Sequence, residues 1–285
     1  MKYLKIFSIL PIVYILIATF FITFQRKLIY HPPKPIASIP TNYDIPYEPV
    51  TIKTSDDLNL SAWWMPQKES TTSATLLYCH GNGADLSHLS HVTKVFYGYG
   101  LNTLFFDYRS YGKSDLGKLT ENSIAIDAEA AFQWLLSKGI PENKIIIWGH
   151  SLGSSVAARL AANHDVAGLI LEGAFPSMFL MGQERYPWLP LAEFMILDKF
   201  DTASYLSTRS TPLLMTHAEN DTVIPIKFGM QAFEKASEPK EWLVIKGIDH
   251  SDFPMVEKFY KDQIMEFINK SLSTAQLNNV KTTEQ

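Results

Sequence analysis

This chain of 285 residues contains almost no cysteine and no large excess of charge of either sign. Its single cysteine, Cys79, excludes an internal disulfide and leaves the redox compartment open. Cys79 ends an apolar run that begins at Ala74, so we expect a buried structural thiol rather than a reactive one. The net charge of −4 and the pI near 6.1 provide no electrostatic basis for binding nucleic acid.

Internal repeats and metal-binding clusters are also missing from the sequence. His88 and His91 are three residues apart, a spacing compatible with metal ligation on a helix, but no companion cluster accompanies them. We interpret the pair as part of a solvated helix face. The sequence therefore predicts neither a metal nor an organic cofactor.

One long hydrophobic run is present, from Tyr3 to Phe24, with Lys5 as its only charge. It has about the length that a helix needs to cross the hydrocarbon core of a membrane. A cleaved signal peptide would have a shorter apolar centre and a small-x-small site, and a buried core helix would be less uniformly apolar. The run predicts an uncleaved, single-pass membrane anchor over residues 1–25. The very short leading tail favours a cytoplasmic amino terminus, with the body of the protein outside the cytosol.

Three regions follow the predicted anchor. Residues 26–48 are rich in proline and indicate an extended spacer. Residues 49–271 have the size of one α/β domain, which includes an aromatic and methionine-rich insertion at 174–205. Residues 272–285 are polar without an apolar period, so we expect a flexible tail.

Strand-like and helix-like segments alternate along the domain. Apolar β-branched runs predict strands at 49–53, 59–65, 75–79, 103–106, 144–148, 167–171, 212–216 and 241–245, and helical patterns cover 86–98, 122–138, 151–163, 228–236 and 253–270. This alternation predicts an α/β fold with a mostly parallel sheet that is covered by helices on both faces. The first two strands have no helix between them and indicate an antiparallel hairpin. In such sheets a ligand binds beyond the carboxyl ends of the strands.

The most informative pattern is Gly149-His150-Ser151-Leu152-Gly153, which lies between a predicted strand and a predicted helix. In that context Gly-x-Ser-x-Gly is a nucleophile elbow, in which the serine adopts strained backbone and the glycines prevent collisions. The hydroxyl of Ser151 would project above the sheet at the positive end of the following helix, where an oxyanion can be stabilised. The pattern predicts a catalytic serine, and a plain tight turn is the alternative.

A second glycine-containing turn, His80-Gly81-Asn82-Gly83, follows the predicted strand 75–79. Glycines here allow the backbone to turn over the sheet, so that amide groups can point at a developing negative charge. We expect the backbone amides of Asn82 and Leu152 to form an oxyanion hole. An ordinary glycine turn is the alternative interpretation.

Two further polar residues follow the last predicted strands. Asp221 can hold an imidazole in one tautomer, and His250 can take the serine proton and pass it to a leaving group. Glu172 is a rival carboxylate, because it also follows directly on a strand, and Glu219 is a weaker rival in the same loop as Asp221. Asp221 is preferred because its loop comes later in the chain, beside the last strand. The order Ser151, Asp221, His250 is that of the α/β-hydrolase arrangement.

The sequence resembles the α/β-hydrolase superfamily over residues 25–271. The resemblance rests on these motifs, on residues 25–32 and on the stretch Asp107-Tyr108-Arg109-Ser110-Tyr111-Gly112-Lys113-Ser114. The similarity is greatest to membrane-anchored serine hydrolases, which include bacterial proteins of unassigned substrate and eukaryotic protein depalmitoylases. The resemblance implies an eight-stranded, mostly parallel sheet preceded by one transmembrane helix. It also implies Ser151 as nucleophile, His250 as base and Asp221 as acid, with oxyanion amides at Asn82 and Leu152. Arg109, in the stretch 107–114, is expected to brace a loop rather than to act as a catalyst.

The sequence thus predicts a membrane-tethered serine hydrolase that cleaves carboxylic esters or thioesters through an acyl-enzyme. The anchor favours a membrane-linked substrate such as a lipid or an acylated protein. An amidase or peptidase would use the same residues, and a tethered binding module without turnover is an alternative of another class. The insertion at 174–205 either packs over the core or forms a shallow apolar lid over an acyl chain.

Overall fold

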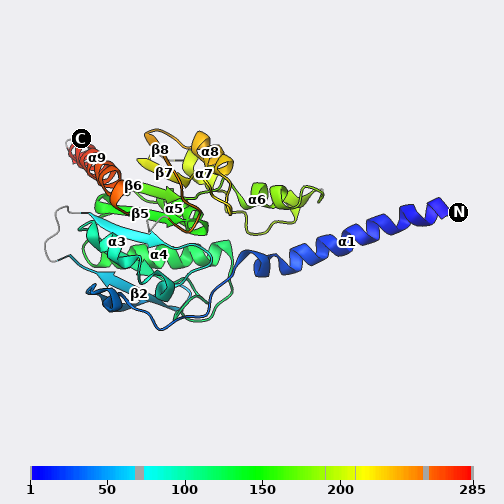
Figure 1. The fold of residues 1–285 in the computed structure, drawn as a ribbon, viewed down its shortest axis with the longest axis horizontal. Coiled ribbons are helices and arrows are strands. Elements are labelled where there is room, and N and C mark those ends of the chain that lie inside the picture. The colour runs from blue at the N-terminus through cyan, green and yellow to red at the C-terminus, as the bar shows by residue number, and fades with distance from the viewer. Residues whose placement is uncertain (1, 68–73, 190, 209, 253–256, 284–285) are drawn as a thin grey trace.

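The computed structural model describes residues 2–67, 74–189, 191–208, 210–252 and 257–283. An eight-stranded sheet with the order β1-β2-β4-β3-β5-β6-β7-β8 runs through the body of the protein (Figure 1). The strands are β1 (Glu48–Lys53), β2 (Asn59–Met65), β3 (Thr75–Cys79), β4 (Asn102–Phe106), β5 (Ile145–His150), β6 (Gly168–Glu172), β7 (Leu213–Ala218) and β8 (Lys240–Ile245). Only β1–β2 and β2–β4 pair antiparallel. The predicted opening hairpin and mostly parallel sheet are therefore confirmed.

Helices cover both faces of the sheet, as predicted. One layer contains α4 (Glu121–Ser137), α5 (Leu152–Ala161), α7 (Thr202–Ser207) and α8 (Ile226–Lys235), and the other contains α2 (Leu86–Leu89), α3 (Thr93–Gly98) and α9 (Glu257–Thr283). Short 3-10 turns occur at Pro40–Tyr43, Glu142–Lys144 and Ala192–Phe194. Each layer buries one apolar face against the sheet, which is how an α/β domain forms its core.

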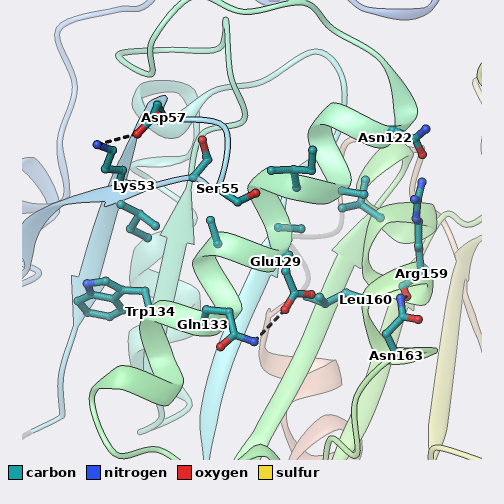
Figure 2. A pocket seen from close by; sticks show the side chains of 17 residues that line it. Lys53, Ser55, Asp57, Asn122, Glu129, Gln133, Trp134, Arg159, Leu160 and Asn163 are labelled. Atoms are coloured by element: carbon teal, nitrogen blue, oxygen red, sulfur yellow. Dashed lines mark hydrogen bonds and ion pairs between the residues drawn. The ribbon is translucent and has the colours of Figure 1, made fainter.

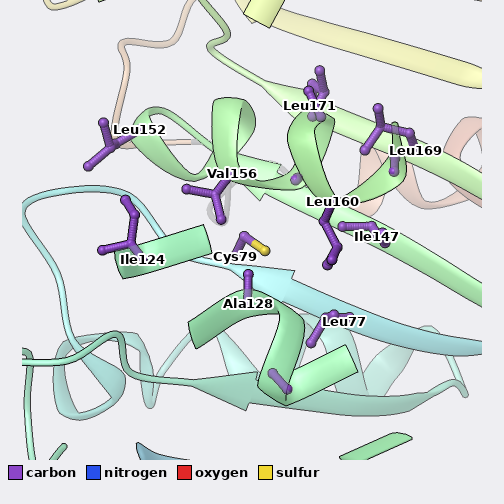
Figure 3. Packing of buried hydrophobic residues seen from close by; sticks show 14 of the residues in the cluster. Leu77, Cys79, Ile124, Ala128, Ile147, Leu152, Val156, Leu160, Leu169 and Leu171 are labelled. Atoms are coloured by element: carbon purple, nitrogen blue, oxygen red, sulfur yellow. The ribbon is translucent and has the colours of Figure 1, made fainter. Parts of the chain in front are cut away.

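The central strands form because their side chains are apolar on both faces, as a covered parallel sheet requires. Successive side chains of a strand point to opposite faces, so in β3 Leu77 and Cys79 join one core cluster while Leu76 and Tyr78 join the other. Figure 3 shows the first cluster, where side chains of α4 and α5 pack over these strands. Cys79 is fully buried, as predicted, and burial raises the pKa of its thiol to about 12.

Two helical segments differ from the prediction. The expected helix 86–98 is split into α2 and α3, because the hydroxyls of Ser90 and Thr93 donate hydrogen bonds to nearby carbonyls and compete with a continuous helix. Within the expected flexible tail 272–285, α9 continues as a helix to Thr283. No glycine or proline interrupts α9, and Leu272 is buried against the second core cluster. The beginning of the helix predicted at 253–270 lies outside the described residues.

The N-terminal helix α1 (Lys2–Ile29) projects from the body of the protein (Figure 1). Its residues Pro11–Ile29 have a mean hydropathy of 1.7, and by length and composition they could cross a membrane. The insertion between β6 and β7 contains α6 (Met178–Arg185) and extends along α1 on the same side of the molecule. The aromatic rings of Phe21 in α1 and Tyr186 in the insertion lie 5.1 Å apart.

Candidate active site

Ser151 lies at the tight reversal between β5 and α5. Its backbone has φ +53° and ψ −121°, a region that side-chain-bearing residues rarely adopt, and its N–H donates to the carbonyl of Glu172 at 2.9 Å. A β-carbon at Gly153 would collide with the carbonyl oxygen of Cys79, and one at Gly149 would collide with the carbonyl of Gly153. Glycine at both places therefore allows α5 to begin directly against the neighbouring strands, with Ser151 at the turn.

His250 and Asp221 form a buried pair at the carboxyl ends of β8 and β7. The Nδ1 atom of His250 lies 2.7 Å from Oδ2 of Asp221, and both side chains are almost fully shielded from solvent. The second carboxylate oxygen of Asp221 accepts hydrogen bonds from the backbone amides of Val223, at 3.0 Å, and Ile224, at 2.6 Å. This carboxylate is thus fixed by its own loop and aligned on the imidazole.

A cavity of about 430 Å³ is lined by three of the five predicted site residues. Ser151, His250 and Asn82 all line it. Gly173 supplies room for the imidazole: it has φ +56°, and a β-carbon there would lie 3.0 Å from Cε1 of His250. Sequence reasoning missed Gly173, although a glycine directly after a strand that ends at the site is a usable signal.

The two rival carboxylates have other surroundings than Asp221. Glu172 lines the cavity, but its carboxylate lies 3.7 Å from Nδ1 of the neighbouring His150. Glu219 is exposed, and its backbone N–H donates to the carbonyl of Ile245. The structure therefore brings Asp221, and neither of its rivals, to Nδ1 of the His250 ring.

A second imidazole that sequence reasoning did not assign to the site also faces Asp221. Nε2 of His217 lies 3.4 Å from the same carboxylate oxygen and 2.7 Å from the carbonyl oxygen of Ile224. Because a carbonyl can only accept, Nε2 of His217 carries the proton. Burial lowers the pKa of His217, which keeps this ring neutral beside the Asp221–His250 pair.

The side chain of Asn82 connects the site to the end of α1. Its Oδ1 accepts from the backbone N–H of His31 at 2.9 Å and from the hydroxyl of Tyr111 at 2.7 Å, while Nδ2 donates to the carbonyl of Ile29 at 2.5 Å. The side chain of Asn82 therefore ties its turn to the end of α1 and to Tyr111. Leu152 begins α5, and the first amides of a helix have no carbonyl partner one turn earlier.

Comparisons with known proteins agree with this geometry. A family model described as serine aminopeptidase, S33, matches residues 70–209. An uncharacterized protein of Mycobacterium tuberculosis is 33% identical, over 92% of this chain and 95% of that protein. The human alpha/beta hydrolase domain-containing protein 17B is 30% identical, over 70% of this chain and 67% of the relative. The chain belongs to the α/β-hydrolase superfamily.

Solved structures show the same fold at lower sequence identity. The esterase Pf2001 of Pyrococcus furiosus superposes with a TM-score of 0.68 at 20% identity, covering 86% of this chain and 98% of the esterase. The α/β-hydrolase fold that the sequence motifs imply is thereby confirmed for this hydrolase.

Two buried ionisable groups lie at the turn His80-Gly81-Asn82-Gly83 of this hydrolase. His80 is fully buried with Nδ1 at 2.7 Å from the carbonyl oxygen of Gly81, and burial lowers its pKa to about 4. Asp107 lies 3.7 Å from Nε2 of His80, and burial raises its pKa to about 8.

Arg109 bonds to Asp127 and Asp56 from a buried position, which confirms its predicted role as a brace.

His88 and His91 do not share a helix face as predicted, although His91 is exposed and His88 is half-buried. Both residues line the cavity beside Ser151, and α2 ends before His91. The imidazole of His88 pairs with Asp85, and its Nδ1 lies 2.9 Å from the Asp85 carboxylate. Within the described ranges, no group of three or more histidine, cysteine or acidic residues could hold a metal ion.

A larger cavity of about 1010 Å³ lies between the β1–β2 turn and helices α4 and α5 (Figure 2). Two pairs of its polar side chains contact each other: Lys53 pairs with Asp57, and Gln133 donates to Glu129, each at 2.8 Å. None of the five predicted site residues lines it. The smaller cavity at the elbow is therefore the candidate active site.

Proposed function

We propose that this chain is a membrane-tethered serine hydrolase that cleaves carboxylic esters or thioesters through an acyl-enzyme. The observation that carries the proposal is the 2.7 Å contact between Asp221 and Nδ1 of His250, in a cavity that Ser151 also lines. With Nδ1–H donating to Asp221, Nε2 of His250 carries a lone pair that can accept the proton of the Ser151 hydroxyl. The elbow supplies the nucleophile and the buried pair supplies its base.

The reaction follows from these roles. The Ser151 oxygen attacks the acyl carbonyl while His250 takes its proton, which forms a tetrahedral oxyanion. Collapse of this intermediate breaks the bond to the alcohol or thiol, which leaves with the proton from His250. Water then attacks the acyl-enzyme by the same route and releases the acid.

The backbone amides of Asn82 and Leu152 are the proposed donors to the oxyanion. Asn82 is held by its side-chain bonds to α1 and Tyr111, and Leu152 is held at the first turn of α5. Donors that are fixed before the reaction need no reorganisation as charge develops, and removing one typically costs about a hundredfold or more in rate.

The proposed substrate is linked to a membrane, either a lipid or an acylated protein. The apolar helix α1 supports this, because it would hold residues 49–271 beside a bilayer through the spacer 26–48. The sequence favours an orientation with the body outside the cytosol. Amide cleavage by the same residues is a second candidate, since the matching family model is described as serine aminopeptidase.

The first test is labelling with a fluorophosphonate, which reacts covalently with activated serines, followed by intact mass. We expect one adduct on the parent chain and none on Ser151→Ala or His250→Ala. Ser251→Ala is the matched control, because Ser251 lines the same cavity beside His250 and should label normally. No adduct on folded parent protein would overturn catalysis and favour a tethered binding module. Initial rates on matched ester, thioester and amide substrates then separate the bond types.

A further inference from the structure

We propose that the tip of the insertion is a second membrane-embedded element, which enters the hydrocarbon of one leaflet alongside α1. The insertion tip comprises the described residues 186–189 and 191–197. This inference rests on the proposed membrane anchor, and it predicts more than the anchor does, namely that the body of the enzyme is itself immersed on one side.

The insertion tip packs along α1 rather than over the catalytic cavity. Leu189 and Met195 form a separate apolar cluster, which contacts Tyr14, Ile17, Ala18 and Phe21 of α1 together with Phe179 and Tyr186. Gln25 fixes the position of the insertion tip along α1. Its Nε2 donates to the carbonyl of Met195 at 2.9 Å, and its Oε1 accepts from the amide of Leu197 at 2.8 Å. No described residue from 174 through 205 lines the cavity around Ser151, so the insertion is not a lid in this structure.

The depth of these contacts matches one leaflet. Tyr14 and Gln25 are eleven residues apart, which corresponds to about 16 Å along a helix. The hydrocarbon core of a bilayer is about 30 Å thick, so the insertion tip runs beside α1 for about half of that thickness. If α1 spans the bilayer, the segments packed against Tyr14 and Phe21 must lie in the hydrocarbon with it.

The outward surface of the insertion tip is apolar. Trp188, Leu191, Phe194 and Leu197 are 60%, 57%, 77% and 52% exposed, and Glu193 is the only charged residue from 186 through 197. The helix α1, against which the tip packs, also exposes apolar side chains, among them Leu16, Phe20 and Phe24. A large contiguous apolar patch on a protein surface indicates a binding site for another apolar phase, and lipid acyl chains are the phase that already surrounds an anchor.

In both α1 and the insertion tip, apolar residues give way to charged residues at the same height along the α1 axis. Arg26 follows the apolar part of α1, Asp198 follows the insertion tip, and the two form an ion pair at 3.0 Å. Lys27 and Lys199 continue the charged level as exposed side chains. Charged residues that flank apolar segments mark the boundary between hydrocarbon and headgroups. We therefore place the membrane surface at this ion pair.

This placement positions the active site close to the headgroups. Asn82 lines the catalytic cavity and binds the carbonyl of Ile29, which is three residues, or about 5 Å along the helix, beyond Arg26. A substrate whose scissile bond lies at the headgroup level, such as an acyl ester of a lipid, would reach the cavity without leaving the membrane surface.

Site-specific fluorescence quenching tests the inference on the full chain. Cys79 is fully buried, so a cysteine introduced at an exposed position is the thiol that a fluorophore reaches. The variants are Phe194→Cys in the insertion tip, Leu16→Cys in α1 and Leu277→Cys as an exposed apolar control on α9, on the opposite side of the molecule (Figure 1). Each is reconstituted in phosphatidylcholine vesicles that carry a nitroxide on the acyl chain, and iodide serves as the aqueous quencher. Retained hydrolysis of a soluble ester shows that each variant is folded.

We expect the nitroxide to quench the labels at positions 194 and 16 several-fold more strongly than the label at 277, and iodide to show the reverse order. Quenching at 16 but not at 194 would overturn the inference while leaving the anchor intact. No nitroxide quenching at 16 would overturn the membrane tether and the inference together, and fluorophosphonate labelling would still report on catalysis. Protection of position 194 from both quenchers would also overturn the inference, because it would show that protein covers the insertion tip.

Discussion

The two oxygens of the Asp221 carboxylate have different partners. One oxygen is held by the amides of its own loop, and the other lies between the imidazoles of His250 and His217. In Asp221→Asn, the amide group can present its NH₂ to Nδ1 of His250 and stabilise the wrong tautomer. We expect kcat on a soluble ester to fall by about 10⁴-fold with little change in fold.

Glu172→Gln is the matched control for that substitution, because Glu172 lines the same cavity and lies beside His150 rather than His250. Its kcat should fall less than about tenfold, since no tautomer of the base depends on it. Equal losses in the two variants, measured as initial rates with circular dichroism to check folding, would contradict the assignment of Asp221.

His80 and Asp107 predict an unusual dependence of stability on pH. Burial lowers the pKa of His80 from 6.5 to about 4, so stability rises with pH between those values, because only the unfolded chain binds that proton. Burial raises the pKa of Asp107 from 3.8 to about 8, so stability falls as pH rises across that range, because only the folded chain keeps that proton. The two slopes oppose each other below about pH 6.5, and above it only that of Asp107 remains.

Between pH 6.5 and 8 the free energy of unfolding should therefore decrease by about 2 kcal/mol through Asp107 alone, at about 1.4 kcal/mol per pH unit. Asp107→Asn removes this ionisation and should flatten the decrease by that amount. Urea unfolding of both proteins at the two pH values measures it. Parallel decreases in the parent and the variant would mean that Asp107 is already ionised in the folded chain.

Sequence reasoning could identify site residues only where a local pattern or a place after a strand carries a signal. Ser151 lies in a five-residue motif, and Asp221 and His250 each follow a strand, so all three were predicted. His217 lies inside a buried strand, where a histidine has no pattern that distinguishes it from a core residue. Its contact with Asp221 depends on how the loop after β7 folds back, which only the structure shows.

At the scale of elements, the close packing of α5 against the end of β3 determines the geometry of the turn at Ser151. A β-carbon at Gly153 would meet the carbonyl oxygens of both Cys79 and His80, and backbone atoms cannot rotate away as a side chain can. We expect Gly153→Ala to lower the free energy of unfolding by about 3 kcal/mol, because α5 must move off the sheet. Gly83→Ala is the control, because a β-carbon there meets nothing within 4 Å. Similar urea midpoints for the two variants would contradict this account.

Strands were predicted more accurately than helices, for a physical reason. The predicted bounds of β2 and β3 are those observed, because a residue that interrupts the strand pattern follows each of them, Pro66 after β2 and the turn at His80-Gly81 after β3. The break between α2 and α3 depends on hydroxyl-to-backbone bonds of Ser90 and Thr93, which the apolar period does not reveal. The helix over 272–283 is stabilised by contacts of Leu272 and Ala275 with distant parts of the core.

At the scale of the whole molecule, the position of the insertion was the least predictable feature. Its aromatic and methionine-rich composition fitted packing over the core and a lid over a substrate equally well. The structure shows that Phe175, Met178 and Met181 of the insertion pack on the core, as one of these alternatives predicts. The tip of the insertion has a further partner, the apolar helix α1, which is more than 150 residues away in the sequence. Composition reports that a segment has an apolar surface, and only the three-dimensional arrangement reports what covers it.

The same arrangement makes α1 part of the enzyme rather than a simple tether, and two truncations can separate those roles. A chain that lacks residues 1–13 keeps every contact described here between α1 and the body, since these begin at Tyr14. A chain that lacks residues 1–29 loses the bonds from Gln25 and Arg26 to the insertion and the bond from Asn82 to Ile29. Asn82 supplies a proposed oxyanion amide, so loosening its turn should weaken the stabilisation of the transition state.

In detergent with a soluble ester, we expect the shorter truncation to leave kcat unchanged. The longer one should lower kcat by at least about tenfold with a smaller change in KM, because a displaced oxyanion donor acts on the transition state more than on substrate binding. Equal activity of the two truncated chains, each shown to be folded by its near-ultraviolet circular dichroism, would mean that the Asn82 turn keeps its geometry without α1. Activity that depends on the end of α1 would instead make this helix a structural component of the proposed catalytic site.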